Sequence, residues 1–159
     1  MKKTDKYYFF WNGPFSQWYK SEFTVEGITF VTAEQYMMYN KAKLFEDDEI
    51  AELILKTDNP SEQKMLGRSV KNFDKKIWER QAKNIVTKGN IAKFSQNEEL
   101  LSFMKNTKDL ILVEASSYDK IWGIGLSEND PDIEDESKWQ GTNWLGECLM
   151  KVRKELFPN

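Results

Sequence analysis

The sequence predicts a mostly helical α+β fold with a small β component, formed by one domain over residues 1–159. Its length fits a single hydrophobic core. Apolar residues recur at helical spacing through the middle and the end of the chain, whereas few short segments alternate as strands do. No internal repeat, low-complexity tract or linker divides the sequence. The predicted order is a little β-structure, many helices, one strand and a final helix.

The first thirty residues carry the strand signals. Residues 6–10 are predicted to form a short strand, and residues 11–14 the turn that ends it. Residues 15–19 form an aromatic loop with no clear period. Residues 23–30 alternate apolar and polar positions on both sides of Glu26-Gly27, which predicts a hairpin.

A helix is predicted directly after this hairpin, and it carries the most informative polar residues. Thr32 followed by Gln35 is typical of a capping box. Glu34, Met37, Met38, Lys41 and Phe45 then share one face. Glu34 and Lys41 are seven residues apart, about 10 Å along a helix axis, so both can reach one small ligand. Alternatively, Glu34 complements the helix dipole and Lys41 extends its amine out of the core.

The remaining elements follow from caps and apolar spacing. Residues 46–56 and 61–70 are predicted helices, and Pro60 suits a first helical turn. Asp74 is expected to cap a helix that runs to about Phe94, and Asn97 to start another. Residues 110–113 form the clearest buried strand. Thr142 or Asn143 is expected to cap the last helix, whose apolar stripe comprises Leu145, Leu149, Val152 and Leu156.

Composition excludes several kinds of chemistry. The chain has no histidine and one cysteine, Cys148, so it lacks the residues for a conventional zinc site, a Ser-His-Asp triad or a Cys-His pair. Carboxylates, lysine, tyrosine, hydroxyls or a bound cofactor remain as sources of catalysis. A lone cysteine cannot form an intramolecular disulfide and fits a reducing compartment. With no membrane-length apolar run and no signal-peptide pattern, we expect a cytoplasmic protein.

Charge and aromatic content narrow the kind of ligand. The net charge of −3 argues against general nucleic-acid binding but leaves room for a local phosphate pocket. The six tryptophans indicate either a stacking site for a planar ligand or a tryptophan-rich core. Residues 128–136 contain six acids without EF-hand spacing, which is typical of a solvated loop. We therefore expect no metal.

Several motifs, taken together and in order, are more specific. From about residue 9 to residue 157 the chain resembles the NADAR, or YbiA-like, family. The matching segments are Phe15-Ser16-Gln17-Trp18, Ala33-Glu34-Gln35-Tyr36-Met37-Met38, Lys41-Ala42, Leu66-Gly67-Arg68, Lys93-Phe94, residues 119–125, Trp139-Gln140-Gly141, and Asn143-Trp144-Leu145-Gly146 with residues 149–153. Gln35 stands where many relatives have histidine, and Trp144 where some have arginine or leucine.

The resemblance implies an N-glycosidase that cleaves the bond between a ribosyl carbon and a base or amine nitrogen. It implies two substrate classes: phosphoribosylamino-pyrimidine intermediates of riboflavin biosynthesis, and ADP-ribose attached to guanine of nucleic acid or of a nucleotide. We favour the second because no riboflavin-synthesis domain is fused to the chain. A non-catalytic ADP-ribose or NAD sensor is the alternative of another class. No cofactor, membrane association or obligate protein partner is expected.

The resemblance also implies site residues, and residue chemistry agrees with several of them. The family's glutamate, lysine and aspartate fall on Glu34, Lys41 and Asp119, the candidate catalytic residues. The candidate substrate-binding residues are Phe15, Ser16, Arg68, Trp78, Lys93, Trp122, Gly123 and Asn143. Arg68 and Lys93 suit phosphate, and Trp78 or Trp122 can stack on a base or sugar. Structural roles compete: Arg68 as a surface ion pair, Trp78 as core, and Asp119 as a cap.

Overall fold

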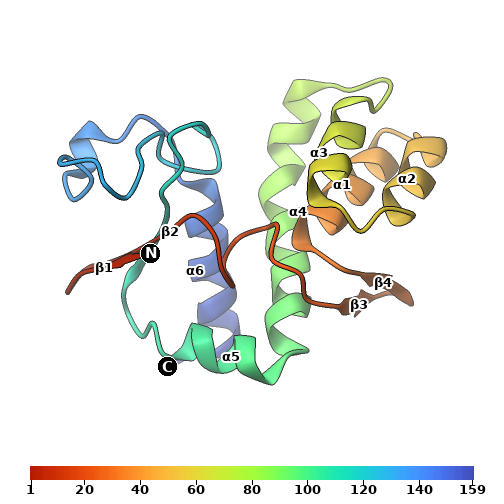
Figure 1. Cartoon of the computed structure of the whole chain (residues 1–159). Helices are drawn as coiled ribbons and strands as arrows, with labels where there is room; N and C mark the ends of the chain where they lie inside the picture. The colour runs from red at the N-terminus through yellow and green to blue at the C-terminus, as the bar shows by residue number, and fades with distance from the viewer. The chain divides into compact units, whose positions relative to one another are not determined.

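The computed structural model describes residues 1–159, which form two compact units. Unit 1 comprises residues 1–16 and 99–159, and unit 2 comprises residues 17–98. The predicted mostly helical α+β class is confirmed, because six α-helices accompany five short strands (Figure 1).

Unit 1 is built on a three-stranded sheet. Its strands are β1 (Lys2–Lys3), β2 (Tyr7–Phe10) and β5 (Ile111–Glu114), in the order β1-β2-β5. β1 and β2 are antiparallel, and β2 and β5 are parallel. β1 was not predicted, because two lysines carry no apolar alternation.

The last helix, α6 (Trp144–Leu156), packs against β5 in unit 1. A Cβ on Gly146 would lie 2.1 Å from the carbonyl oxygen of Leu112, so this contact requires glycine. The unit's core gathers seven buried residues: Tyr7, Phe9, Val113, Ala115, Ile124, Leu126 and Ile133. The predicted strands β2 and β5 therefore share one apolar cluster with buried residues of the segment 115–133.

Unit 2 begins with the predicted hairpin, formed by β3 (Phe23–Val25) and β4 (Ile28–Phe30). Glu26 and Gly27 both have positive φ, 50° and 82°, as the two central residues of a type I′ turn require. Four helices follow: α1 (Ala33–Leu44), α2 (Asp48–Leu55), α3 (Pro60–Arg68) and the long α4 (Lys75–Ser95). Figure 1 shows α1, α2 and α3 gathered on one side of α4. A short α5 (Glu98–Lys105) comes next in the chain.

Helix α1 is the central helix of unit 2, since α2, α3 and α4 all pack against it. Residues 33–38 are all buried. Burial in the first half of this helix thus extends beyond the predicted face that carries Glu34, Met37 and Met38. Polar side chains at these positions consequently need partners inside the protein.

The predicted caps of these helices are mostly confirmed. Thr32 Oγ1 accepts a hydrogen bond from the Gln35 amide at 3.0 Å. The Gln35 side chain accepts from Val31 N and donates to the carbonyl oxygens of Ile54 and Thr57, so it joins the start of α1 to the end of α2. Asp74 caps α4 through its side chain, as predicted. Asn59, which was not predicted as a cap, caps α3 in the same way.

Close packing of α4 on α1 depends on Gly89. A Cβ at this position would lie 2.4 Å from a ring carbon of Tyr36. We expect Gly89→Ala to lower the free energy of unfolding by about 1–3 kcal/mol, because a buried ring cannot move aside cheaply. Urea denaturation measures this change.

Gly67→Ala is the matched control, because Gly67 also lies within a helix that packs on α1. Its new Cβ would meet the thioether of Met38, a flexible group that can turn away. The account of this packing is contradicted if Gly89→Ala costs no more than Gly67→Ala.

Candidate active site

Glu34 is held from two sides within unit 2. It lies in the first turn of α1, and only 6% of its surface is exposed. Its backbone N–H donates to the carbonyl oxygen of Gln17 at 2.9 Å, and the Trp18 indole Nε1–H donates to its Oε1 at 3.2 Å. The environment therefore fixes both the position of Glu34 and the direction of its side chain.

Lys41 lies two turns further along α1 and is half-buried. Its Nζ lies 4.6 Å from the ring centroid of Phe73 and 5.6 Å from that of Trp78. Burial lowers the pKa of Lys41, the charge of Glu34 opposes this shift, and the charge of Arg68 adds to it. A lysine with a lowered pKa supplies more neutral amine near pH 7, which is the form that acts as a nucleophile.

Phe73 was not singled out from the sequence, although it contacts Lys41. It lies between α3 and α4, is 45% exposed, and packs edge-on against Phe45 with ring centroids 5.4 Å apart. Its loop is tied to α2 by Asp47, whose Oδ2 accepts from Lys71 N at 2.9 Å. An aromatic residue before a helix cap carries no sequence signal of function, so only the fold identifies this contact.

The other candidates in unit 2 differ in exposure. Arg68 is exposed at the end of α3, and Trp78 is half-buried in α4. Lys93 has no exposed surface, and its Nζ lies 5.6 Å from the ring centroid of Tyr19. Burial lowers its pKa to about 7. Phosphate binding by Lys93 stays a prediction, and it requires a ligand that reaches below the surface.

Two candidates in unit 1 make contacts that shape the backbone. Asp119 Oδ1 accepts from Ile121 N at 2.9 Å and from Trp122 N at 2.8 Å, which is the capping role weighed against catalysis. Asn143 has φ 52°. Its side-chain amide donates to Leu112 O and accepts from Glu114 N, and so holds β5. Asn143 is the N-cap residue of α6, one of the two predicted, but its side chain makes no capping hydrogen bond.

The remaining unit 1 candidates are aromatic or lie in turns. Phe15 is buried against the rings of Tyr8, Phe10 and Phe103. Ser16 N donates to the carbonyl oxygen of Gly13, and Trp122 packs edge-on against Trp144. Gly123 is buried, and a Cβ there would lie 2.9 Å from Asp119 O and 3.0 Å from Glu114 O. Substrate binding by these four stays a prediction.

The candidates thus fall into two sets by unit. Unit 2 contains Glu34, Lys41, Arg68, Trp78 and Lys93. Unit 1 contains Phe15, Ser16, Asp119, Trp122, Gly123 and Asn143. Within unit 2, the effects of Glu34 and Arg68 on the pKa of Lys41 show that these three charges act on one another. This cluster has the clearest catalytic chemistry.

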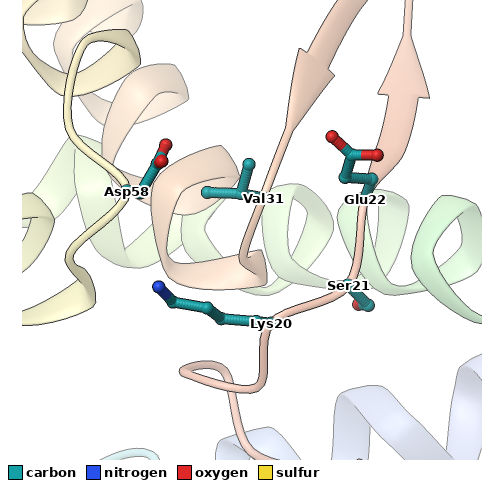
Figure 2. Close-up of a pocket in the computed structure, with 5 residues that line it drawn as sticks. All are labelled: Lys20, Ser21, Glu22, Val31 and Asp58. Carbon is teal, nitrogen blue, oxygen red and sulfur yellow. The ribbon is translucent and has the colours of Figure 1, made fainter.

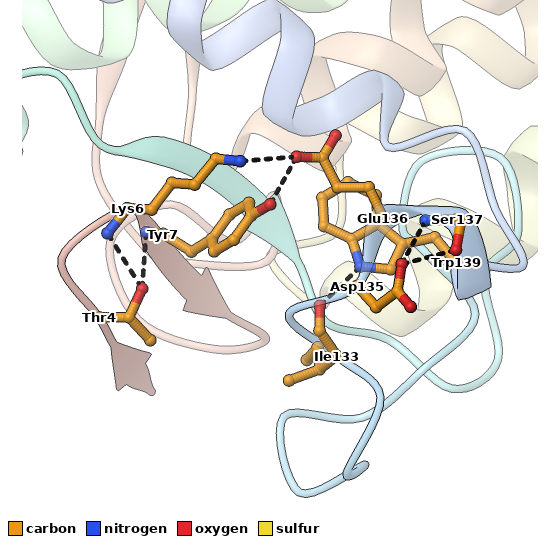
Figure 3. A network of polar contacts seen from close by, with 8 residues as sticks. All are labelled: Thr4, Lys6, Tyr7, Ile133, Asp135, Glu136, Ser137 and Trp139. Atoms are coloured by element: carbon orange, nitrogen blue, oxygen red, sulfur yellow. Dashed lines mark hydrogen bonds and ion pairs between the residues drawn. The ribbon is translucent and has the colours of Figure 1, made fainter.

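The acidic loop after Gly125 lies largely at the surface, as predicted, and several of its side chains have partners within unit 1. Tyr7 and Lys6 both contact the Glu136 carboxylate, and the Trp139 indole donates to Ile133 O at 2.7 Å (Figure 3). Further ion pairs join Glu128 to the N-terminal amine, Glu134 to Lys2 and Asp132 to Lys138. No group of three or more acidic or cysteine side chains in the structure is arranged to hold a metal ion.

A pocket of about 230 Å³ lies elsewhere in unit 2. Lys20, Ser21, Glu22, Val31 and Asp58 line it (Figure 2). It contains neither Glu34 nor Lys41. Its lining offers a lysine and two carboxylates at the surface without a buried reactive group, so it carries no catalytic interpretation.

The sequence profile of the NADAR domain matches residues 7–157. The chain belongs to the NADAR family. None of its helices is long and apolar enough to cross a membrane.

Named relatives within this family include N-glycosidases. The chain is 42% identical to N-glycosidase R617 of Acanthamoeba polyphaga mimivirus, over 96% of this chain and 98% of the relative. It is 30% identical to N-glycosidase YbiA of Escherichia coli, over 91% and 81%. It is 48% identical to Protein irg-1 of Caenorhabditis elegans over 82% of this chain, but that match spans only 62% of irg-1.

The NADAR fold is also supported by a solved structure. The NMR structure of E. coli YbiA matches 98% of this chain and 87% of that chain, with a TM-score of 0.79 and 28% sequence identity. The predicted YbiA-like fold is confirmed.

The burial of Lys93 in this NADAR chain predicts a pH-dependent stability. Between pH 7 and the ordinary lysine pKa of 10.5, the unfolded chain binds a proton that the folded chain has released. The free energy of unfolding therefore rises with pH across this window, and the full penalty of burying the charge applies below pH 7. Lys93→Met removes the titrating group. We expect the parent to gain stability relative to this variant between pH 7 and 10.

Urea denaturation at several pH values measures this difference. Lys83→Met, at a half-buried position of the same helix, controls for loss of a lysine. A constant difference between the parent and Lys93→Met across this range would contradict the account.

Proposed function

We propose that this chain is an N-glycosidase whose reacting groups are Glu34 and Lys41, and that it removes ADP-ribose from ADP-ribosylated guanine. The observation that carries the proposal is the pairing of a buried carboxylate with a lysine of lowered pKa on one helix. Their charges interact: burial lowers the pKa of Lys41, and the charge of Glu34 raises it. The names of the relatives R617 and YbiA support the reaction class.

The chemistry of N-riboside cleavage suits these two groups. The bond from C1 of ribose to the base nitrogen breaks with oxocarbenium character at C1, and the leaving nitrogen takes up a proton. In the favoured route the neutral Lys41 amine attacks C1, the protonated base departs, and the opened sugar forms an imine with Lys41. Water then hydrolyses the imine and releases the sugar. Glu34 transfers the protons near C1.

A second route needs no covalent intermediate. Glu34 as a general base takes a proton from water, and that water attacks C1 as the base leaves. Lys41 then binds a phosphate or hydroxyl group of the substrate. The hydrogen bond from the Trp18 indole to the carboxylate is compatible with both routes, because each needs Glu34 held in a fixed direction.

Groups near Lys41 fit the rest of an ADP-ribosyl substrate. Arg68 can bind the diphosphate through its planar fork, and the rings of Phe73 and Trp78 can stack on a base or sugar. Asp119 in unit 1 is the third proposed catalytic residue, and its Oδ1 is engaged by backbone amides. The proposed reaction requires no metal.

Parallel incubation with ADP-ribosylated guanine DNA and with the ribosylamino-uracil phosphate tests the function. We expect mass spectrometry to show free guanine-containing DNA and ADP-ribose in the first reaction. Consumption of the pyrimidine intermediate alone would transfer the assignment to riboflavin biosynthesis. Tight ADP-ribose binding by calorimetry, with no product from either substrate, would favour the sensor.

Variants of the two reacting residues separate the routes in the same assay. We expect Glu34→Gln and Lys41→Ala to be folded and nearly inactive, and Lys41→Arg to be inactive because it cannot supply a neutral amine. Borohydride added during turnover should trap a sugar adduct on Lys41. If Lys41→Ala keeps most of its turnover while Glu34→Gln loses it, the imine route is wrong and Glu34 acts on water.

A further inference from the structure

The groups that bind Glu34 belong to a short segment without regular structure. Residues 17 and 18 lie outside every helix and strand, yet the Gln17 carbonyl binds the Glu34 amide and the Trp18 indole binds the Glu34 carboxylate. Such a segment needs its own anchor, because a loose loop cannot fix the direction of a carboxylate. The anchor is the side chain of Gln17, which is only 8% exposed.

Asn90 of α4 holds the Gln17 side chain. The Asn90 Nδ2 group donates to Gln17 Oε1 at 2.9 Å and to the carbonyl oxygen of Val86, also at 2.9 Å. Asn90 is completely buried, and both of its N–H groups are therefore used. The neighbouring Gly89 permits the close contact of α4 with Tyr36 of α1. A continuous set of contacts thus runs from α4 through Gln17 to the start of α1.

This pair of amides is poorly suited to stability alone. Asn90 Oδ1 and Gln17 Nε2 are buried without any hydrogen-bond partner. Each such buried group lowers the stability of the fold, whereas two apolar side chains of the same shape would avoid this loss. What the amide pair supplies is direction, because a hydrogen bond fixes the rotation of Gln17 and an apolar contact does not. A costly, directional contact next to a reactive carboxylate indicates a positioning role.

We propose that Asn90 and Gln17 are positioning residues of the N-glycosidase centre, and that they act through Trp18 to aim the Glu34 carboxylate. This inference rests on the proposed function of Glu34. The side chain of Asn90 fixes that of Gln17. The backbone carbonyl of Gln17 in turn holds the Glu34 amide at the start of α1. The adjacent Trp18 then donates its indole N–H to Glu34 Oε1. Neither amide touches the substrate, so their loss affects the reaction through the geometry of Glu34.

Substitutions with apolar residues of similar size test the proposal. We expect Asn90→Leu and Gln17→Met each to lower kcat by about 10- to 100-fold, since a carboxylate displaced by about 1 Å loses that much. KM should change less than threefold, and urea denaturation should show no loss of stability. The double variant should be no slower than the slower single variant, because both act through the same contacts. Thr87→Val, at another buried polar position of α4, is the matched control and should keep its kcat.

A second readout does not need turnover. The Trp18 indole N–H resonance, assigned with Trp18→Phe, should move as Glu34 titrates, and it should stop moving in Glu34→Gln. In Asn90→Leu and Gln17→Met we expect this movement to shrink, whereas Thr87→Val should retain it. Unchanged titration and unchanged kcat in the two amide variants would overturn the proposal while leaving the proposed function intact. Failure of the proposed function would instead appear as an inactive parent with an intact Trp18 titration.

Discussion

The burial of the first half of α1 is the constraint on which the rest of unit 2 depends. Because α2, α3 and α4 surround this helix, its polar side chains cannot be satisfied by bulk water. The Gln35 side chain accepts a hydrogen bond from Val31 N and donates one to the carbonyl oxygen of Ile54. The Thr32 hydroxyl donates to the side-chain oxygen of Gln63. Glu34 is the acidic member of this set, and its Oε1 accepts a hydrogen bond from the Trp18 indole N–H. A reactive carboxylate is thereby held in a defined direction and largely shielded from solvent.

Lys41 shows how the same packing alters reactivity. Removal of the amine from water favours the neutral form, while the carboxylate of Glu34 favours the charged form. The aromatic rings of Phe73 and Trp78 supply the low-polarity surroundings, although the faces of such rings also attract a cation. Burial is the largest of these effects, so the balance leaves the pKa lowered. A helix that only stabilised the fold would have no need of an amine in this position.

Sequence patterns predicted the parts that depend on local spacing. The hairpin turn at Glu26-Gly27, the caps at Thr32 and Asp74, and the placement of Glu34 and Lys41 on α1 all follow from residues near one another in the chain. Asn90 and Phe73 were missed because their roles arise from approaches between distant segments. Asn143 illustrates a competing demand. Asparagine is a common capping side chain, but here its side-chain amide forms hydrogen bonds with the backbone of β5. The acids of residues 128–136 lie mostly at the surface, as expected, and basic groups of the N-terminal segment form ion pairs with three of them.

Glu34 and Lys41 influence each other's charge within α1, and NMR titration of the Lys41 amine, with labelled lysine, measures this directly. We expect a pKa below the ordinary lysine value in the parent. We expect a further decrease in Glu34→Gln, because the carboxylate that favours the charged amine has been removed. An ordinary lysine pKa that does not respond to the substitution would contradict the account.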